Sequence, residues 1–185
     1  MDVVYFDKAG RENTDKCIDI AEKNIGKYKD VVVATTTGET GLMAAKRFGK
    51  KANVVVVTHS SGFKGENVEE ISDAKRKEIE AAGGKLFTGT ILTCSIERSF
   101  ADKYSGYGMS TVVADTLRLL GQGMKVCVEI VLEACDAGMI EEGKDVLAVA
   151  GTGRGADTVC VIKSAVSRRF HSLKVREILA KPRDF

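Results

Sequence analysis

The chain has 185 residues, 44% of them hydrophobic, which is enough for one sizeable core and predicts a single domain over residues 1–185. Its 28 Lys and Arg against 26 Asp and Glu leave a formal net charge of +2. That balance gives no support for nucleic acid or an anionic membrane as the main partner. With no Trp, seven Phe and four Tyr, the chain also offers little for stacking bases.

The cysteines indicate a reducing compartment. They are odd in number, lie mostly in apolar runs and have no C-x-x-C spacing, which predicts buried thiols rather than a disulfide scaffold or a zinc site: Cys17, Cys94, Cys127, Cys135 and Cys160. The first residues lack the layout of a signal peptide, and no apolar run approaches the roughly 18 residues of a membrane span. We therefore expect a soluble, cytoplasmic protein.

The N-terminal elements are a short apolar run and a helix. Val3–Phe6 is either an edge strand or an extended lead-in, and Asn13 or Thr14 can cap the helix that follows. The apolar positions of that helix fit a period of 3.6: Cys17, Ile20, Ala21, Ile25 and Tyr28. Asp30–Ala34 is then continuously apolar, which predicts a strand covered on both faces.

The stretch from Val31 to Gly41 is the strongest candidate for a ligand site. A run of β-branched residues ends in hydroxyls and glycines, and a helix follows over Leu42–Phe48. This layout aims free backbone N–H groups and the positive end of a helix dipole at an anion. The residues that we expect to bind a phosphate are Thr35, Thr36, Thr37, Gly38, Thr40 and Gly41.

The alternative for this stretch is a structural turn with a capping threonine and a glycine that packs the helix. Because no G-K-[ST] sequence is present, hydrolysis of a nucleotide by a Walker-type site is not expected. The carboxylate of Glu39 would repel a phosphate unless it points away.

Two more strand–helix steps follow. Asn53–Val57 predicts a second apolar strand, which runs into a polar loop over Thr58–Gly65. A helix capped by Ser72 continues through Ala82, and Lys85–Thr88 is a shorter strand. Strands that alternate with helices predict right-handed crossovers and a parallel sheet.

The segment Thr88–Ser110 shows the least regular pattern and is expected to be a functional lid or a partly ordered loop. Two helices are predicted after it. The first runs from Ser110 or Thr111 to Leu120. The second carries Cys127, Ile130, Val131, Ala134 and Cys135 on one face. A strand over Val126–Leu132 is the alternative, but the spacing of Glu129 and Glu133 favours helix.

The C-terminal part predicts two strands joined by a glycine loop. Asp145–Ala150 and Thr158–Lys163 are connected by only Gly151–Asp157, which is too short for a parallel crossover and requires an antiparallel pair. Val175–Ala180 is either a last strand or a short helix before Pro182. The predicted fold is therefore a three-layer α/β/α architecture with a mostly parallel sheet and at least one antiparallel strand.

Ligands of open α/β sheets bind beyond the carboxyl ends of the parallel strands. The loops Thr35–Gly41, Thr58–Gly65 and Gly151–Asp157 should meet there. His59 could serve as an acid or base or as a plain donor, and Arg154 could clamp an anion. Asp157 either accepts hydrogen bonds from a ligand or stabilises its own hairpin.

No metal site is predicted, since the two histidines lie far apart and have no carboxylate cluster near them. Ser60, Ser61 and Cys94 have no identifiable base partner, so no catalytic residue can be assigned. Arg11 could reach a ligand, whereas helix capping is the duty expected of Asn13.

A series of motifs resembles one known family over almost the whole chain. The motifs, in order, are Gly10–Thr14, Thr35–Gly41, Val57-Thr58 with Gly62-Phe63, Glu97–Ser99, Lys125–Ile130, Arg154–Thr158 and Pro182-Arg183. They resemble stand-alone archaeal and bacterial proteins that correspond to the alpha/beta, carboxy-terminal domain of pyruvate kinase.

The resemblance implies a fold similar to that domain, in which a comparable turn takes the phosphate of an allosteric effector. It also implies bound flavin mononucleotide (FMN), with the phosphate at Thr35–Thr40 and the ribityl or ring near His59, Gly62, Arg154 and Asp157. Pyruvate kinase chemistry is not implied, because it needs a (β/α)₈ barrel.

Three hypotheses follow. The first is an FMN-binding protein, the second a regulatory module that senses a phosphorylated metabolite, and the third a flavin-dependent oxidoreductase with Thr90–Ser110 as its lid. Association into a homo-oligomer through helices is compatible with each of them.

Overall fold

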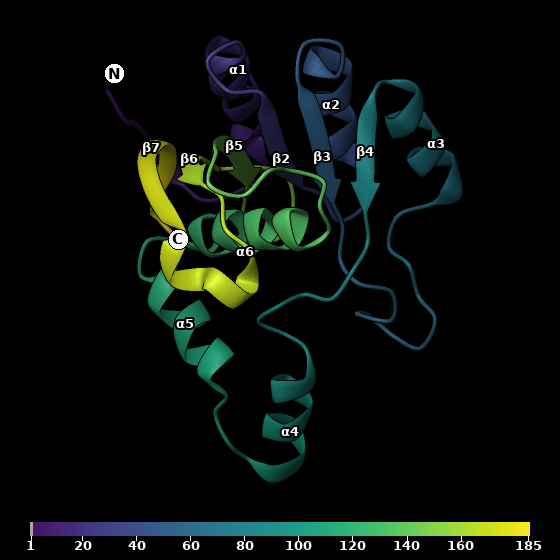
Figure 1. Ribbon diagram of the computed structural model, residues 1–185, viewed down its shortest axis with the longest axis vertical. Helices are drawn as coiled ribbons and strands as arrows, with labels where there is room; N and C mark the ends of the chain where they lie inside the picture. Colours follow the sequence, from purple (N-terminus) through teal and green to yellow (C-terminus); the bar gives the residue numbers. More distant parts are fainter. Residues whose placement is uncertain (1) are drawn as a thin grey trace.

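A seven-stranded mixed sheet forms the centre of the protein in the computed structural model, which describes residues 2–185 (Figure 1). The strand order is β1-β7-β6-β5-β2-β3-β4. The strands are β1 Val4–Lys8, β2 Asp30–Ala34, β3 Asn53–Val57, β4 Gly84–Phe87, β5 Asp145–Ala150, β6 Thr158–Lys163 and β7 Lys174–Asp184. Only β6 runs antiparallel to its neighbours, β5 and β7. The mostly parallel sheet with an antiparallel strand is thereby confirmed.

Helices cover both faces of the sheet and complete three layers (Figure 1). One face carries α1 (Thr14–Asn24), α2 (Glu39–Phe48) and α3 (Asp73–Ala81). The other face is covered by α6 (Gln122–Asp136), against which α5 (Met109–Arg118) packs. Two 3₁₀ turns, η1 (Arg11–Asn13) and η2 (Ser167–Ser172), lie beside α1 and α6.

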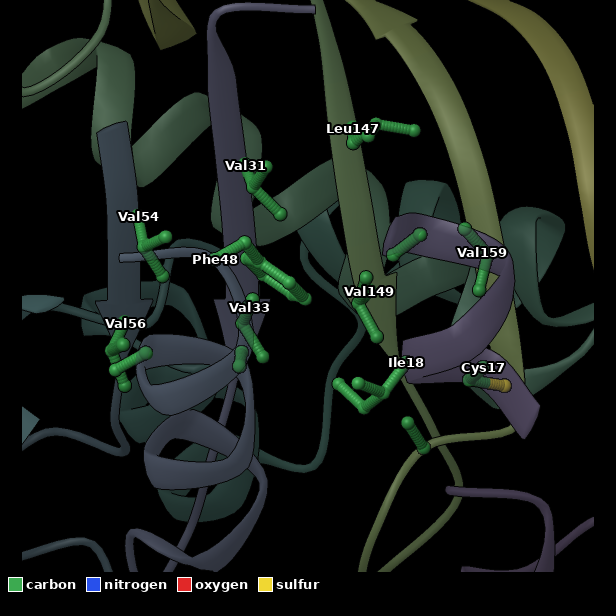
Figure 2. Packing of buried hydrophobic residues seen from close by; sticks show 14 of the residues in the cluster. Cys17, Ile18, Val31, Val33, Phe48, Val54, Val56, Leu147, Val149 and Val159 are labelled. Carbon is green, nitrogen blue, oxygen red and sulfur yellow. The ribbon is translucent and has the colours of Figure 1, made fainter. Parts of the chain in front are cut away.

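The alternation of side chains along β2 explains why this strand is continuously apolar. Val31 and Val33 point into the cluster under α1 and α2, whereas Val32 points into the cluster under α6, and all three are fully buried. Figure 2 shows Val31 and Val33 in the first cluster together with Phe48 of α2 and Ile18 of α1. The central strands are therefore held on both faces.

The segment predicted to be irregular contains a helix, α4 (Ile96–Tyr104). In Figure 1 this helix lies away from the sheet, and none of its residues is buried. Its left-handed C-cap at Ser105 and the hydrogen bond that the Ser110 N–H donates to Glu97, 2.7 Å long, fix it locally. The prediction missed α4 because its apolar residues have no core to face.

The open alternative for the C-terminal tail is settled in favour of a strand. β7 pairs in parallel with the edge strand β1 and antiparallel with β6. Its pairing with β6 ends at Ala180, so Pro182 lies where β1 is its only neighbour. A proline is tolerated there because it interrupts no ladder in the middle of the sheet.

All five cysteines are free thiols, and four of them are buried as predicted. The exception is Cys94, which is exposed on the segment between β4 and α4. None of the helices between residues 2 and 185 has the length and apolar character that crossing a bilayer requires.

Replacing Phe48 with Ala tests this core. Phe48 is fully buried between α2 and the sheet, so Phe48→Ala should lower the free energy of unfolding by about 3–5 kcal/mol. Phe100→Ala in α4 is the matched control, because Phe100 is 60% exposed and its loss should change stability by less than about 0.5 kcal/mol. Urea denaturation of both variants measures the difference, and equal effects would contradict this description of the core.

Candidate functional site

A cleft of about 1030 Å³ opens where β2, β3 and β5 end. The three loops expected at this edge all contribute to it, and Ile91 and Cys94 add the segment that follows β4. The N-terminus of α2 forms one wall, and the face of α6 from Gln122 to Glu133 forms another. The convergence of loops predicted from the strand order is therefore present.

Six of the ten predicted site residues line this cleft: Thr35, Thr36, Thr37, Thr40, His59 and Arg154. The other four, Gly38, Gly41, Gly62 and Asp157, lie outside its lining.

The Thr35 hydroxyl holds the turn between β2 and α2. Its Oγ1 accepts hydrogen bonds from the Gly38 N–H at 3.1 Å and the Gly41 N–H at 3.4 Å. The first amides of a helix have no partner within the helix, and Thr35 satisfies two of those in this turn. Among residues 2–185 no acceptor is found for the remaining amides of the turn, those of Thr36, Thr37, Glu39 and Thr40.

The two glycines of the turn serve its geometry. Gly38 has φ of 95°, a left-handed conformation that favours glycine, at the N-cap of α2. A Cβ on Gly41 would overlap the Val56 side chain of β3, so Gly41 lets α2 pack closely on the sheet. Neither glycine lines the cleft. The positions of both glycines fit a role in shaping the turn and packing the helix better than direct contact with a ligand.

The Glu39 carboxylate, next to the turn, has a lysine close to it. Its side chain is 74% exposed and its Oε1 lies 3.7 Å from Lys75 Nζ on α3. The lysine offsets part of the negative charge next to the free amides.

His59 and Arg154, which come from different loops, are connected by Glu70. The Glu70 Oε2 lies 2.6 Å from His59 Nδ1, and its Oε1 lies 3.7 Å from the Arg154 guanidinium. The Glu70 side chain is only 11% exposed, and the His59 ring packs on Phe63 with centroids 4.4 Å apart. No pattern in the sequence pointed to Glu70, because it sits in an acidic loop without periodicity.

Asp157 has a structural position. It is fully buried, its Oδ2 accepts from the N–H groups of Gly10 (3.2 Å) and Thr152 (3.0 Å), and its Oδ1 accepts from the Thr158 hydroxyl at 2.8 Å. Asp157 does not line the cleft, and its contacts are those of the structural alternative, in which it stabilises its own hairpin. Gly62 likewise serves a turn, with φ of 80° and its N–H donating to Val68 at 2.9 Å.

The N-terminal segment lies against the Gly151–Asp157 loop. Thr14 Oγ1 donates to the Arg11 carbonyl at 2.5 Å and accepts from the Ala156 N–H at 3.0 Å. This places Arg11 on the rim of the cleft. The expectation that the Asn13 side chain caps α1 is wrong. This side chain instead donates to the Lys8 carbonyl at 2.9 Å.

The wall formed by α6 carries three buried charged residues that were not predicted as site residues. Lys125, Glu129 and Glu133 are spaced four apart, are each at most 5% exposed and all line the cleft. Lys125 Nζ pairs with Glu129 Oε2, while Glu129 Oε1 accepts from the Thr93 N–H (2.9 Å) and hydroxyl (2.5 Å). Glu133 Oε1 accepts from the Leu92 N–H at 3.3 Å.

Burial and the neighbouring Glu129 raise the pKa of Glu133 to about 8. Its carboxyl is therefore mostly protonated at neutral pH. The signal for this face is present in the sequence as charges at a spacing of four in an apolar helix, a pattern that indicates a helix but does not by itself indicate a site.

In the part of the chain that the structure describes, no three His, Cys, Asp or Glu side chains come together as a metal site requires.

The family follows from a comparison with known protein families. The family described as "Pyruvate kinase, alpha/beta domain" matches residues 15–162, a stretch that begins in α1 and ends in β6. The chain belongs to the pyruvate kinase alpha/beta domain family. The resemblance read from the motifs is thereby confirmed, and the matched stretch includes the threonine turn and the charged face of α6.

Among solved structures, a mutant of O-ureido-L-serine synthase with bound O-ureido-L-serine shares 21% identity with this chain. The match covers 73% of this chain and 41% of that protein, so this pyruvate kinase alpha/beta domain protein spans less than half of its length. The TM-score is 0.30, a likeness too weak to support any conclusion about function.

Replacing Thr35 with Val tests its role in the turn. Thr35→Val keeps the shape but leaves the buried Gly38 and Gly41 amides without their acceptor, which should cost about 1–3 kcal/mol of unfolding free energy. Thr37→Val, on an exposed position of the same turn, should be neutral. Chemical denaturation measures both, and a stable Thr35→Val variant would refute this role.

The raised pKa of Glu133 makes stability depend on pH. Because the folded state holds this proton up to about pH 8, the contribution is complete below the unfolded pKa of about 4.5 and is lost as pH rises through about 8. At about 1.4 kcal/mol per pKa unit, the loss amounts to several kcal/mol.

The measurement is the difference in unfolding free energy between wild type and Glu133→Gln from pH 5 to pH 9. The wild type should lose stability relative to Glu133→Gln as pH rises, whereas exposed Glu80→Gln should follow the wild type. Parallel curves for all three proteins would mean that Glu133 is ionised in the folded state.

Proposed function

We propose that this protein binds a small molecule through its phosphate group at the Thr35–Thr40 turn, and that the ligand is FMN. The observation that carries the proposal is a set of backbone amides for which residues 2–185 provide no acceptor. All of them belong to residues that line one cleft: Thr36, Thr37, Glu39 and Thr40.

The electrostatics of the turn favour an anion. The amides lie at the N-terminus of α2, where the helix dipole adds partial positive charge. A hydrogen bond to a charged group contributes about 1.5–3 kcal/mol, so a few such donors hold a phosphate without a lysine. Arg11 and Arg154 line the same cleft and are exposed, so both guanidinium groups can approach the anion.

The rest of the cleft suits a flavin. Its volume of about 1030 Å³ lies just above the usual range of roughly 300–1,000 Å³ for ligand sites. Apolar side chains that can contact the faces of a ring line it: Ala34, Met43, Val57, Phe63, Ile91, Val126 and Ile130. FMN is the ligand expected from the family resemblance. When bound, it would supply electron-transfer chemistry, while the chain supplies binding and orientation.

Pyruvate kinase catalysis is not part of the proposal. The described residues form an open sheet and contain no (β/α)₈ barrel.

The test compares FMN with riboflavin, which lacks the phosphate. The wild type should bind FMN at least tenfold more tightly. Thr40→Val removes a hydroxyl on the cleft wall. It should weaken the binding of FMN by about 10–100-fold and leave the affinity for riboflavin unchanged. Thr116→Val, exposed on α5, is the matched control.

Flavin fluorescence measures these affinities, and a thermal-shift series with sugar phosphates runs beside it. Equal affinity for FMN and riboflavin would contradict a phosphate site at the turn. A response to a sugar phosphate with none to FMN would instead indicate the regulatory module.

A further inference from the structure

The charged face of α6 is left unexplained by phosphate binding at the turn. Lys125, Glu129 and Glu133 are nearly inaccessible to solvent, yet they line the cleft on the wall formed by α6. Removing charged groups from water is costly, and an apolar helix face of the same shape would avoid that cost. Buried ionisable groups that line a cleft often mark a functional site.

We propose that this face of α6 is a second subsite of the cleft, which takes an uncharged ring bearing carbonyl oxygens, with Glu133 as the residue that determines specificity. The inference rests on the proposed function, since the phosphate of the same molecule would occupy the threonine turn.

The charges on this face are already matched to one another. Lys125 is paired with Glu129, and the other oxygen of Glu129 is occupied by the backbone and hydroxyl of Thr93. Neither residue is free to neutralise a charge on a ligand. An anionic group would also meet the carboxylate of Glu129, so the ring portion is uncharged.

Glu133 supplies the hydrogen bond that would distinguish one ligand from another. Its Oε1 accepts from the Leu92 N–H, and its Oε2 has no partner among residues 2–185. Burial and the nearby carboxylates of Glu129 and Asp136 raise the pKa of Glu133 and so favour its protonated form. Lys125 and the Leu92 N–H act in the opposite direction. A protonated Oε2 is a donor, and its complement on a ligand is an acceptor such as a carbonyl oxygen.

Apolar residues complete the subsite. Val126 and Ile130 alternate with the charged residues along α6, and Ile91 lies on the segment after β4. A flat ring can therefore contact aliphatic side chains while its edge meets Glu133. The isoalloxazine of a flavin, which carries two carbonyl oxygens, has this chemistry.

The experiment measures dissociation constants of riboflavin and FMN by fluorescence at pH 6.5 and pH 9, for wild type, Glu133→Gln and the control Glu80→Gln. Riboflavin has no phosphate, so it reports on the ring subsite alone. Wild type and Glu80→Gln should bind it more weakly at pH 9, where most of Glu133 has lost its proton, by up to about tenfold for a pKa of about 8. Glu133→Gln keeps a donor at every pH and should bind equally at both.

Each other outcome is decisive. Riboflavin affinity that rises with pH and is lost in Glu133→Gln would mean that the Glu133 carboxylate accepts a hydrogen bond from the ring N–H, and would overturn the proposal. Affinity that is independent of both pH and the substitution would leave Glu133 a structural residue. Thermal melting at pH 6.5 verifies that the variants are folded.

The two proposals fail separately. If inorganic phosphate stabilises the wild type but riboflavin does not bind at pH 6.5, the ring subsite is overturned and the phosphate turn stands. If riboflavin binds with the expected pH dependence but FMN binds no more tightly than riboflavin, the proposal of a phosphate site at the turn is refuted and the ring subsite stands. If neither phosphate nor either flavin binds, both are refuted.

Discussion

The buried carboxylate of Asp157 is the interaction on which the geometry of the cleft depends. It accepts hydrogen bonds from the segment before α1, from the loop after β5 and from the first residue of β6. It also lies against α6, because Gly123 has no side chain that would meet it. A carboxylate without a cation beside it is stable in such a place only when several donors converge on it. Arg11 and Arg154 flank the cleft because their segments are held together at this point.

The cleft has two ends with different chemistry. At the N-terminus of α2, backbone amides and a helix dipole offer positive potential that does not depend on the ionisation of a side chain. On α6, the potential comes from side chains that balance one another and from one carboxyl whose proton depends on pH. A ligand that spans both ends would gain affinity from the first and specificity from the second, because unpaired buried polar groups penalise the wrong partner.

Most of the fold could be predicted from the sequence, but only part of the candidate site could. Apolar runs such as Val31–Val33 predicted the buried parallel strands because both faces of the sheet are covered, and the short Gly151–Asp157 connection required an antiparallel pair. The contact of Asp157 with the segment before α1 could not be predicted, since its partner Gly10 is 147 positions away. Glu70 lies in a loop without periodicity, and α4 contributes no buried residue from which a pattern could arise. Contacts made by loops depend on tertiary placement, which local patterns do not encode.

The close packing of Gly41 against Val56 has a consequence for how the site can change during evolution. Exchanges among the threonines that line the cleft alter the ligand contacts while the backbone keeps its path. Any side chain at Gly41 would move the start of α2 away from β3 and displace the free amides together. In this protein, ligand preference can therefore change through the lining side chains and the α6 wall without moving the backbone of the turn, whereas a change at Gly41 would disturb the seating of the helix.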